Sequence, residues 1–267
     1  MKLTSQPNSV TTTSKGFRTY NVKGIDRPIV ARKGGPTSEE VKSKESYGEL
    51  RKNQKEFGVA SMMAKVLRQS LSEGMSEICE TYASGKLTAQ FRNLAKQEEG
   101  ETGKRPMYLS KHGHLLNGFE FNSEFPYKKL FDAKYFVKTG SRKGQVILHF
   151  PSFVPHKAFV KPAGATNFKI NVRLVALSDY SYNRAENTYT PKSPELHGMF
   201  GSYETPMLPL LKMPTEPMTS QVSINTRQVI PESVGIFLVM AVSFYKYEGG
   251  RFQHLAKESG MQIHEVY

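Results

Sequence analysis

The 267-residue chain is 38% hydrophobic and 23% charged, a globular but polar composition, and its 37 Lys and Arg against 24 Asp and Glu give a net charge of +13. One large domain or two small ones fit this length. The single cysteine excludes an intramolecular disulfide and a multi-cysteine zinc site, and no apolar run is long enough for a membrane-spanning helix. With no apolar core of a secretory signal at its start, the chain is expected to be soluble, cytoplasmic and without a membrane partner.

Residues 1–46 are predicted to form a basic extended arm. They contain few large apolar side chains, so they cannot bury enough surface to fold alone. Residues 1–34 carry seven basic residues and one acid, whereas residues 191–267 carry six basic and seven acidic residues. This asymmetry favours an acidic partner, which is a phosphate backbone, an anionic surface or an acidic patch on another copy of the chain.

The arm has two alternative uses. Its cations are interleaved with aromatic rings, which is typical of a segment that follows a phosphate backbone and stacks on bases. Apolar residues from Tyr20 to Ile29 equally favour a strand that pairs with the sheet edge of a neighbouring subunit. In either case the candidate contact residues are Lys15, Arg18, Tyr20, Lys23, Arg27, Arg32 and Lys33.

Residues 47–105 are predicted to form a helical hairpin. The first helix presents apolar residues at helical spacing, and the second, from about Met75 to Gln97, is divided by Ser84-Gly85. Residues 98–106 contain two glycines before a proline and no large apolar residue, so they are predicted to be a boundary loop. The face of the first helix that we expect to be buried consists of Phe57, Ala60, Ala64, Leu67 and Leu71.

Residues 106–267 are predicted to form an antiparallel β-sandwich, because strand patterns follow one another without intervening helices. Apolar and polar residues alternate in 145–153, 168–177 and 221–227. Val234–Tyr245 is almost continuously apolar, which indicates a central strand buried on both faces. The long connection Ser178–Pro217 is expected to carry any surface function. The chain is thus predicted to be α+β, with an arm, a helical hairpin and a sandwich.

Ala31–Pro36 contains an Arg-Lys-Gly-Gly element, and Val146–Asn167 contains a Gly-Ala-Thr turn. Together with several other segments between residues 29 and 177, they resemble a family of uncharacterised Bacteroidota proteins. The family pattern has an Arg-Lys-Gly-Gly element, a helical pair and a β-rich C-terminal part with a Gly-Ala-Thr turn. Glu49–Asn53 departs from the more Arg-Thr-Arg-Glu-Asn-like run of that family. Because the family has no established activity, the resemblance implies the layout and no function. The matching segments are Ala31–Pro36, Glu49–Gly58, Lys65–Arg68, Gly85–Thr88, Gly103–Arg105, Asn117–Asn122 and Val146–Asn167.

Candidate catalytic and metal-binding residues are few. His112 and His114 have the spacing of a metal pair on a strand, but two histidines are too few ligands for zinc, so we expect an exposed loop pair. Cys79 is expected to be a small buried hydrophobe. No catalytic or phosphate-loop motif is present. We therefore expect a non-enzymatic protein with no metal, cofactor or small-molecule substrate; the alternative is an enzyme with its site in Ser178–Pro217.

Two functions follow from this layout. The first is a structural or scaffolding protein that forms homo-oligomers through its N-terminal arm and β-sheet edges. The alternative is a nucleic-acid-associated protein that binds the phosphate backbone through the basic arm.

Overall fold

The chain has an α+β fold of helices and antiparallel sheets. The computed structural model describes residues 16–22, 25–32 and 34–267, which group into two compact units, 1–51 and 52–267. The predicted boundary near residue 105 lies inside the second unit, because the predicted helical hairpin and the strands that follow it share a hydrophobic core.

The first unit contains a hairpin and two short helical segments. Its two strands pair antiparallel with each other, with Phe17 opposite Arg32 and Tyr20 opposite Ile29. A capping box of Thr37 and Glu40 begins the helix that follows, since each side chain accepts a hydrogen bond from the other's backbone N–H. The elements are β1 (Phe17–Tyr20), β2 (Ile29–Arg32), α1 (Ser38–Ser43) and η1 (Glu45–Tyr47).

The next helices are α2 (Gly48–Gln69), α3 (Glu73–Ile78) and α4 (Ala83–Ala95). The predicted buried face is wrong at Phe57, which is 52% exposed, and correct at Ala60, Ala64 and Leu67 of α2. The fifth predicted residue, Leu71, is buried but lies two residues after the end of α2. The buried face of α2 also includes Glu56, which is fully buried. A pattern of apolar residues does not mark this position, because glutamate is charged. The predicted break at Ser84-Gly85 lies instead at residues 79–82, so both residues belong to α4.

A six-stranded antiparallel sheet forms the centre of the second unit, with the order β12-β11-β5-β8; β13 also pairs with β11, and β9 pairs with β5. β11 lies between partners on both sides and is buried along most of its length, which confirms the predicted central strand. The strands are β5 (Asn167–Ser178), β8 (Phe200–Glu204), β9 (Leu208–Pro209), β11 (Val234–Glu248), β12 (Arg251–His254) and β13 (Gly260–Val266).

A second, three-stranded sheet has the order β10-β4-β3, and a separate pair of strands forms a hairpin. The predicted alternation in 145–153 is confirmed, because Val146, Leu148 and Phe150 are all buried on one face of β4. The strands of the three-stranded sheet are β3 (Phe136–Thr139), β4 (Gln145–Phe150) and β10 (Met218–Ser223), and those of the hairpin are β6 (Tyr180–Asn183) and β7 (Thr188–Pro191).

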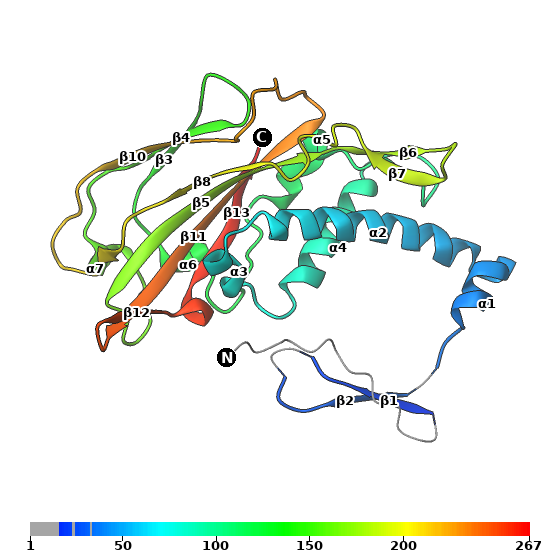
Figure 1. Cartoon of the computed structure of the whole chain (residues 1–267), viewed down its shortest axis with the longest axis horizontal. Coiled ribbons are helices and arrows are strands. Elements are labelled where there is room, and N and C mark those ends of the chain that lie inside the picture. The colour runs from blue at the N-terminus through cyan, green and yellow to red at the C-terminus, as the bar shows by residue number, and fades with distance from the viewer. Residues whose placement is uncertain (1–15, 23–24, 33) are drawn as a thin grey trace. The chain divides into compact units, whose positions relative to one another are not determined.

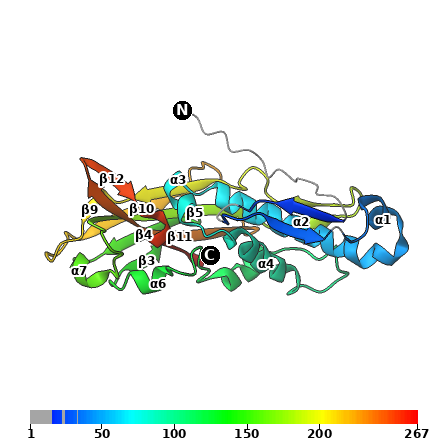
Figure 2. The same ribbon diagram turned by 90° about the horizontal axis from the view of Figure 1, so that it is seen from below.

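Two hydrophobic cores lie on opposite faces of the six-stranded sheet. Val175 and Phe237 pack with α2, α3 and α4 in one core, whereas the alternate residues Leu174 and Leu238 pack with β4 and β10 in the other. Figure 1 shows α2, α3 and α4 beside the long strands β5 and β11, and Figure 2 shows α6, α7 and β3 together at the other end of those strands. The sheet is therefore covered by helices on one face and by the three-stranded sheet on the other.

The two sheets also meet at their edges. The backbone N–H of Asn225, just after β10, donates to the carbonyl of Phe200 on β8 over 3.4 Å. A Cβ placed on Gly201 would lie 2.0 Å from the carbonyl oxygen of Ser223, so only glycine permits this approach.

Short helices connect these strands, and the region from 178 to 217 contains β6 to β9 in addition to loops. Its Tyr180 and Tyr189 are buried in the core that contains Val175, Phe237 and the helices α2, α3 and α4, which we call the helix-side core. These two residues of the connection therefore help to build the hydrophobic core. No helix in the described part of the chain is long and apolar enough to cross a membrane. The short helices are α5 (Leu109–His112), η2 (Gly113–Leu116), α6 (Tyr127–Leu130), α7 (Pro155–Ala158) and η3 (Ala256–Glu258).

Candidate nucleic-acid interface

The largest local excess of positive charge lies outside the arm, in residues 125–178. This segment contains ten Lys and Arg and one acid, Asp132, which is a net charge of +9. Residues 35–124, by contrast, carry thirteen basic and thirteen acidic residues. The positive charge of the chain is therefore concentrated in two places, the arm and the segment that builds α6, β3, β4, α7 and β5.

Seven of the ten cations are exposed. Of the remaining three, Lys169 forms an ion pair with Glu204, Lys143 lies 3.5 Å from Glu232, and Arg173 covers the ring of Phe200. Within the described residues, six of the exposed cations lie farther than 4 Å from any acidic side chain; the seventh, Lys128, is attracted by Glu120. We call these seven the basic layer: Lys128, Lys129, Lys134, Lys138, Arg142, Lys157 and Lys161.

Backbone pairing brings the two helices of the basic layer together. The N–H of Asp132 donates to the carbonyl of Ala158, and the N–H of Val160 donates to that of Leu130. This short bridge follows both α6, which carries Lys128 and Lys129, and α7, which carries Lys157. Because the pairing is antiparallel, α6 lies at the end of the bridge next to Val160, and α7 lies at the other end, next to Asp132. Cations from two separate stretches of the chain thus flank one short bridge, where their potentials add.

Three other cations of the basic layer follow the edge strand β3 and its turn, and the last one, Lys161, lies after α7. Lys134 precedes the strand, Lys138 lies within it, and Arg142 lies in the turn to β4. A pocket of about 190 Å³ opens beside this turn and is lined by Arg142, Lys143 and Tyr267 among others. A cationic turn next to a small pocket is suited to an anionic group such as a phosphate.

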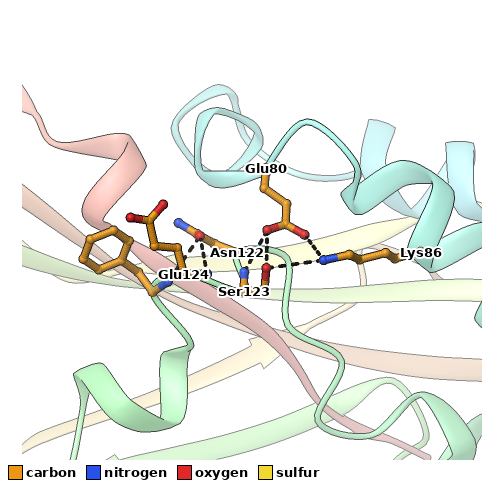
Figure 3. A network of polar contacts seen from close by, with 6 residues as sticks. Glu80, Lys86, Asn122, Ser123 and Glu124 are labelled. Atoms are coloured by element: carbon orange, nitrogen blue, oxygen red, sulfur yellow. Dashed lines mark hydrogen bonds and ion pairs between the residues drawn. The ribbon is translucent and has the colours of Figure 1, made fainter. Parts of the chain in front are cut away.

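A network of polar contacts, shown in Figure 3, fixes the segment before α6. The Glu80 carboxylate accepts the Ser123 hydroxyl and backbone N–H at 2.5 and 3.0 Å, and it pairs with Lys86 at 2.5 Å. Burial raises the pKa of Glu80, but the hydrogen bonds from Lys86 and Ser123 outweigh it and hold that pKa below its usual value. A carboxylate that remains ionised in this way is a weak base, so the Ser123 hydroxyl is held rather than activated.

Asn122 and Glu120 complete the attachment of α6. The Asn122 amide donates to the carbonyls of Lys257 and Ser259 at 2.8 and 3.0 Å, while its oxygen accepts the backbone N–H groups of Glu124 and Phe125. Glu120 accepts the N–H of Tyr127 at the start of α6 over 2.9 Å. The cations of α6 therefore project from a rigid base.

The predicted arm residues are only partly brought together. Arg32 lies on β2 opposite Phe17, Tyr20 is half-buried on β1, and Arg27 is exposed in the connection between the two strands. The side chain of Arg18, on β1, is outside the described side chains. The remaining predicted contacts, Lys15, Lys23 and Lys33, lie outside the described residues.

The candidate metal-binding histidines and the single cysteine lie in different surroundings. His112 is not in an exposed loop: it ends α5 and contacts the Glu98 carboxylate at 2.7 Å, whereas His114 is exposed. Within the described residues, no group of three or more His, Cys, Asp or Glu side chains is arranged to hold a metal ion. Cys79 is half-buried against the helix-side core, and burial raises its pKa to about 11.

A histidine in the 178–217 connection is held in one tautomer. The backbone N–H of Ser178 donates to Nδ1 of His197 at 3.1 Å, so Nε2 carries the proton and donates to the Tyr180 hydroxyl at 3.1 Å. Burial lowers the pKa of His197 below 6.5. Both ring nitrogens thus form hydrogen bonds within the fold, and the imidazole links Ser178 to Tyr180 as a structural group.

This histidine makes stability depend on pH. Its folded pKa is below its unfolded value, so the unfolded chain binds more protons and stability falls as pH decreases below about 6.5. We expect the free energy of unfolding of His197→Gln to change less between pH 7 and pH 5, by up to about 1.4 kcal/mol per pH unit. Urea denaturation of both proteins at several pH values measures this; identical slopes would contradict it. His114→Gln, at an exposed position, is the control.

No protein-family model, curated protein or solved structure matches this chain.

Proposed function

We propose that the protein is a non-enzymatic, nucleic-acid-associated protein that binds the phosphate backbone through the basic layer, assisted by the basic arm. The observation that carries this proposal is the concentration of ten basic residues and one acid in residues 125–178, with six exposed cations that have no acidic partner among the described residues. Such a surface attracts a polyanion and releases its counterions on binding.

The fold supports this assignment by presenting the cations on a rigid surface. In our proposal the two sheets of residues 106–267 form a sandwich, and the sandwich face formed by β3, β4 and β10 carries the bound chain. The shared core of β4, β5, β10 and β11 and the approach of β8 to β10 support this arrangement. A soluble, cytoplasmic protein is consistent with such a role.

The test is binding to a fluorescent 20-nucleotide single strand, measured by anisotropy across a salt series. The triple variant Lys134→Glu, Lys138→Glu, Arg142→Glu is expected to bind roughly 10- to 100-fold more weakly than the wild type, and its salt slope should fall by about 2, since each phosphate contact contributes about 0.7. Charge reversal acts directly on the three cations that lie before β3, on it and in the turn after it.

The matched control reverses three exposed lysines outside residues 125–178, in Lys65→Glu, Lys96→Glu, Lys257→Glu. It changes the net charge by the same amount. If both triple variants lose affinity equally, the binding follows net charge and the basic layer is not an interface. If the wild type fails to bind at low salt, the proposed function is wrong.

Self-assembly as a homo-oligomeric scaffold is the second candidate. Its support is that β12 ends the six-stranded sheet, next to an exposed aromatic pair, Tyr247 and Phe252, whose ring centroids are 4.8 Å apart. Against it, β3 and β12 are only four residues long and carry Lys138 and Arg251, which are features that discourage edge pairing. Light scattering of the full-length protein at high concentration distinguishes the two: a monomer that is unchanged by deletion of residues 1–46 would exclude the scaffold.

A further inference from the structure

The outer face of the three-stranded sheet has a regular arrangement of exposed side chains. Strand register places Phe136 beside His149 and His149 beside Thr219, and the neighbouring row contains Lys138, Ile147 and Gln221. The alternate residues of these strands point into the core that contains Leu174, Leu238 and residues of β4 and β10. This outward face spans three strands and is about 10 Å wide, because neighbouring strands lie about 4.8 Å apart.

Phe136 is unusual on this face because a large aromatic ring there has no core to enter. It is 53% exposed, and its ring is stacked on that of His149 with 6.2 Å between centroids and 22° between planes. Nδ1 of His149 also contacts the Thr219 hydroxyl at 2.8 Å, which restrains the imidazole. One face of the pair is thus supported by the sheet, and the phenyl ring remains available to a ligand.

The cations of the basic layer flank this ring on both sides. Lys134 and Lys138 lie two residues before and two residues after Phe136, both are exposed, and neither has an acidic partner among the described residues. Two residues of strand span about 7 Å, so each lysine reaches the space beside the ring. An aromatic ring between two cations is the arrangement that stacks a base and neutralises the adjacent phosphates.

We infer that Phe136, supported by His149, stacks a base of single-stranded nucleic acid while Lys134 and Lys138 contact the phosphates on either side. This inference rests on the proposed function and specifies its ligand. A duplex hides the faces of its bases, so the stacking contact is made only by a single strand. The Phe136 contact therefore adds to the affinity for a single strand and not to the affinity for a duplex of the same sequence.

The test compares the full-length wild type with Phe136→Ala on three probes: a 20-nucleotide single strand, the corresponding duplex and inorganic polyphosphate. Loss of one stacked base is expected to weaken single-strand binding roughly tenfold and to leave duplex and polyphosphate binding unchanged. Phe136→Tyr keeps the ring and is expected to retain the affinity. Phe252→Ala removes a ring of similar exposure, 48%, from another four-residue edge strand and is expected to bind as the wild type does.

The outcomes separate this inference from the function on which it rests. If the wild type binds all three probes and Phe136→Ala loses affinity for none, the stacking contact is wrong and the phosphate-binding surface stands. If Phe136→Ala weakens all three probes equally, the ring has no selective role and the inference also fails. If the wild type binds no probe, the proposed function itself is wrong.

Discussion

Replacing Arg105 by Met is expected to lower the free energy of unfolding by about 3–5 kcal/mol, because it leaves the Glu56 carboxylate buried without its cation. Glu56 is fully buried on α2, and Arg105 binds both of its oxygens through Nε at 2.9 Å and Nη2 at 2.7 Å. The N–H of Gly103 is the third donor, at 2.8 Å. Urea denaturation at pH 7 measures the loss.

Lys104→Met is the matched control, since the neighbouring lysine forms an exposed pair with Glu101 and its loss should cost much less stability. The double variant Glu56→Leu, Arg105→Met removes both charges and is expected to recover most of the lost stability. If Arg105→Met is no less stable than Lys104→Met, the buried pair does not hold residues 98–106 on α2.

The pH dependence of this variant follows from the same contacts. In the wild type, burial raises the pKa of Glu56, but Arg105 and Gly103 outweigh it and hold the pKa below 4.5, so the pair contributes stability above about pH 4.5 and loses it as the pH falls further. Without Arg105, burial dominates and the carboxyl binds its proton more tightly in the folded state. The deficit of Arg105→Met is therefore expected to be smaller at pH 5 than at pH 7.

Glu56 also shows where sequence patterns succeed and fail for this fold. The long strands β5 and β11 are visible in the sequence from alternation and continuous apolarity. The alternation in 168–177 predicts a strand buried on one face, however, and β5 is buried on both faces from Leu174 onward. The buried carboxylate of Glu56 interrupts the apolar pattern of α2, whereas Phe57 fits that pattern in the sequence but is exposed in the structure. The partner Arg105 is forty-nine residues away in a polar loop, and a local pattern does not record so distant a contact.

The short elements could not be predicted for a different reason. The helices α6 and α7 have four residues each, which is too few for a 3.6-residue period to appear. The structure pairs β1 with β2 of the same chain. The alternation of side chains along a strand is the same whether its partner lies in the same chain or in another copy. The sequence predicts strand-forming residues there but not their partner.

The basic layer was accessible from the sequence, whereas the aromatic contact was not. A count of charges along the whole chain finds ten basic residues and one acid in 125–178, a larger total excess than the seven basic residues and one acid of residues 1–34. The exposure of Phe136 depends on the register of β3 against β4, and a shift of one residue would expose Val137 instead. Only the fold determines which of the two rows faces outward.

Gly201→Ala is the second variant expected to have a large effect, because its methyl group would collide with the backbone of β10. The added Cβ would lie 2.0 Å from the carbonyl oxygen and 2.5 Å from the carbonyl carbon of Ser223, and neither atom belongs to a flexible side chain. To remove this overlap, β8 and β10 must separate, at an expected cost of about 1–3 kcal/mol or more. Thermal and urea denaturation measure the loss of stability.

Gly85→Ala provides the control, since this glycine lies in α4 with no atom within 4 Å of the added Cβ. Alanine there is expected to raise stability by about 0.5–1 kcal/mol, because glycine loses more backbone entropy in a helix. Opposite signs for the same chemical change would show that the contact between β8 and β10 holds the two sheets together. If Gly201→Ala is as stable as the wild type, β10 is free to move away from β8, and the sheet that carries Phe136 is not rigidly joined to the central sheet.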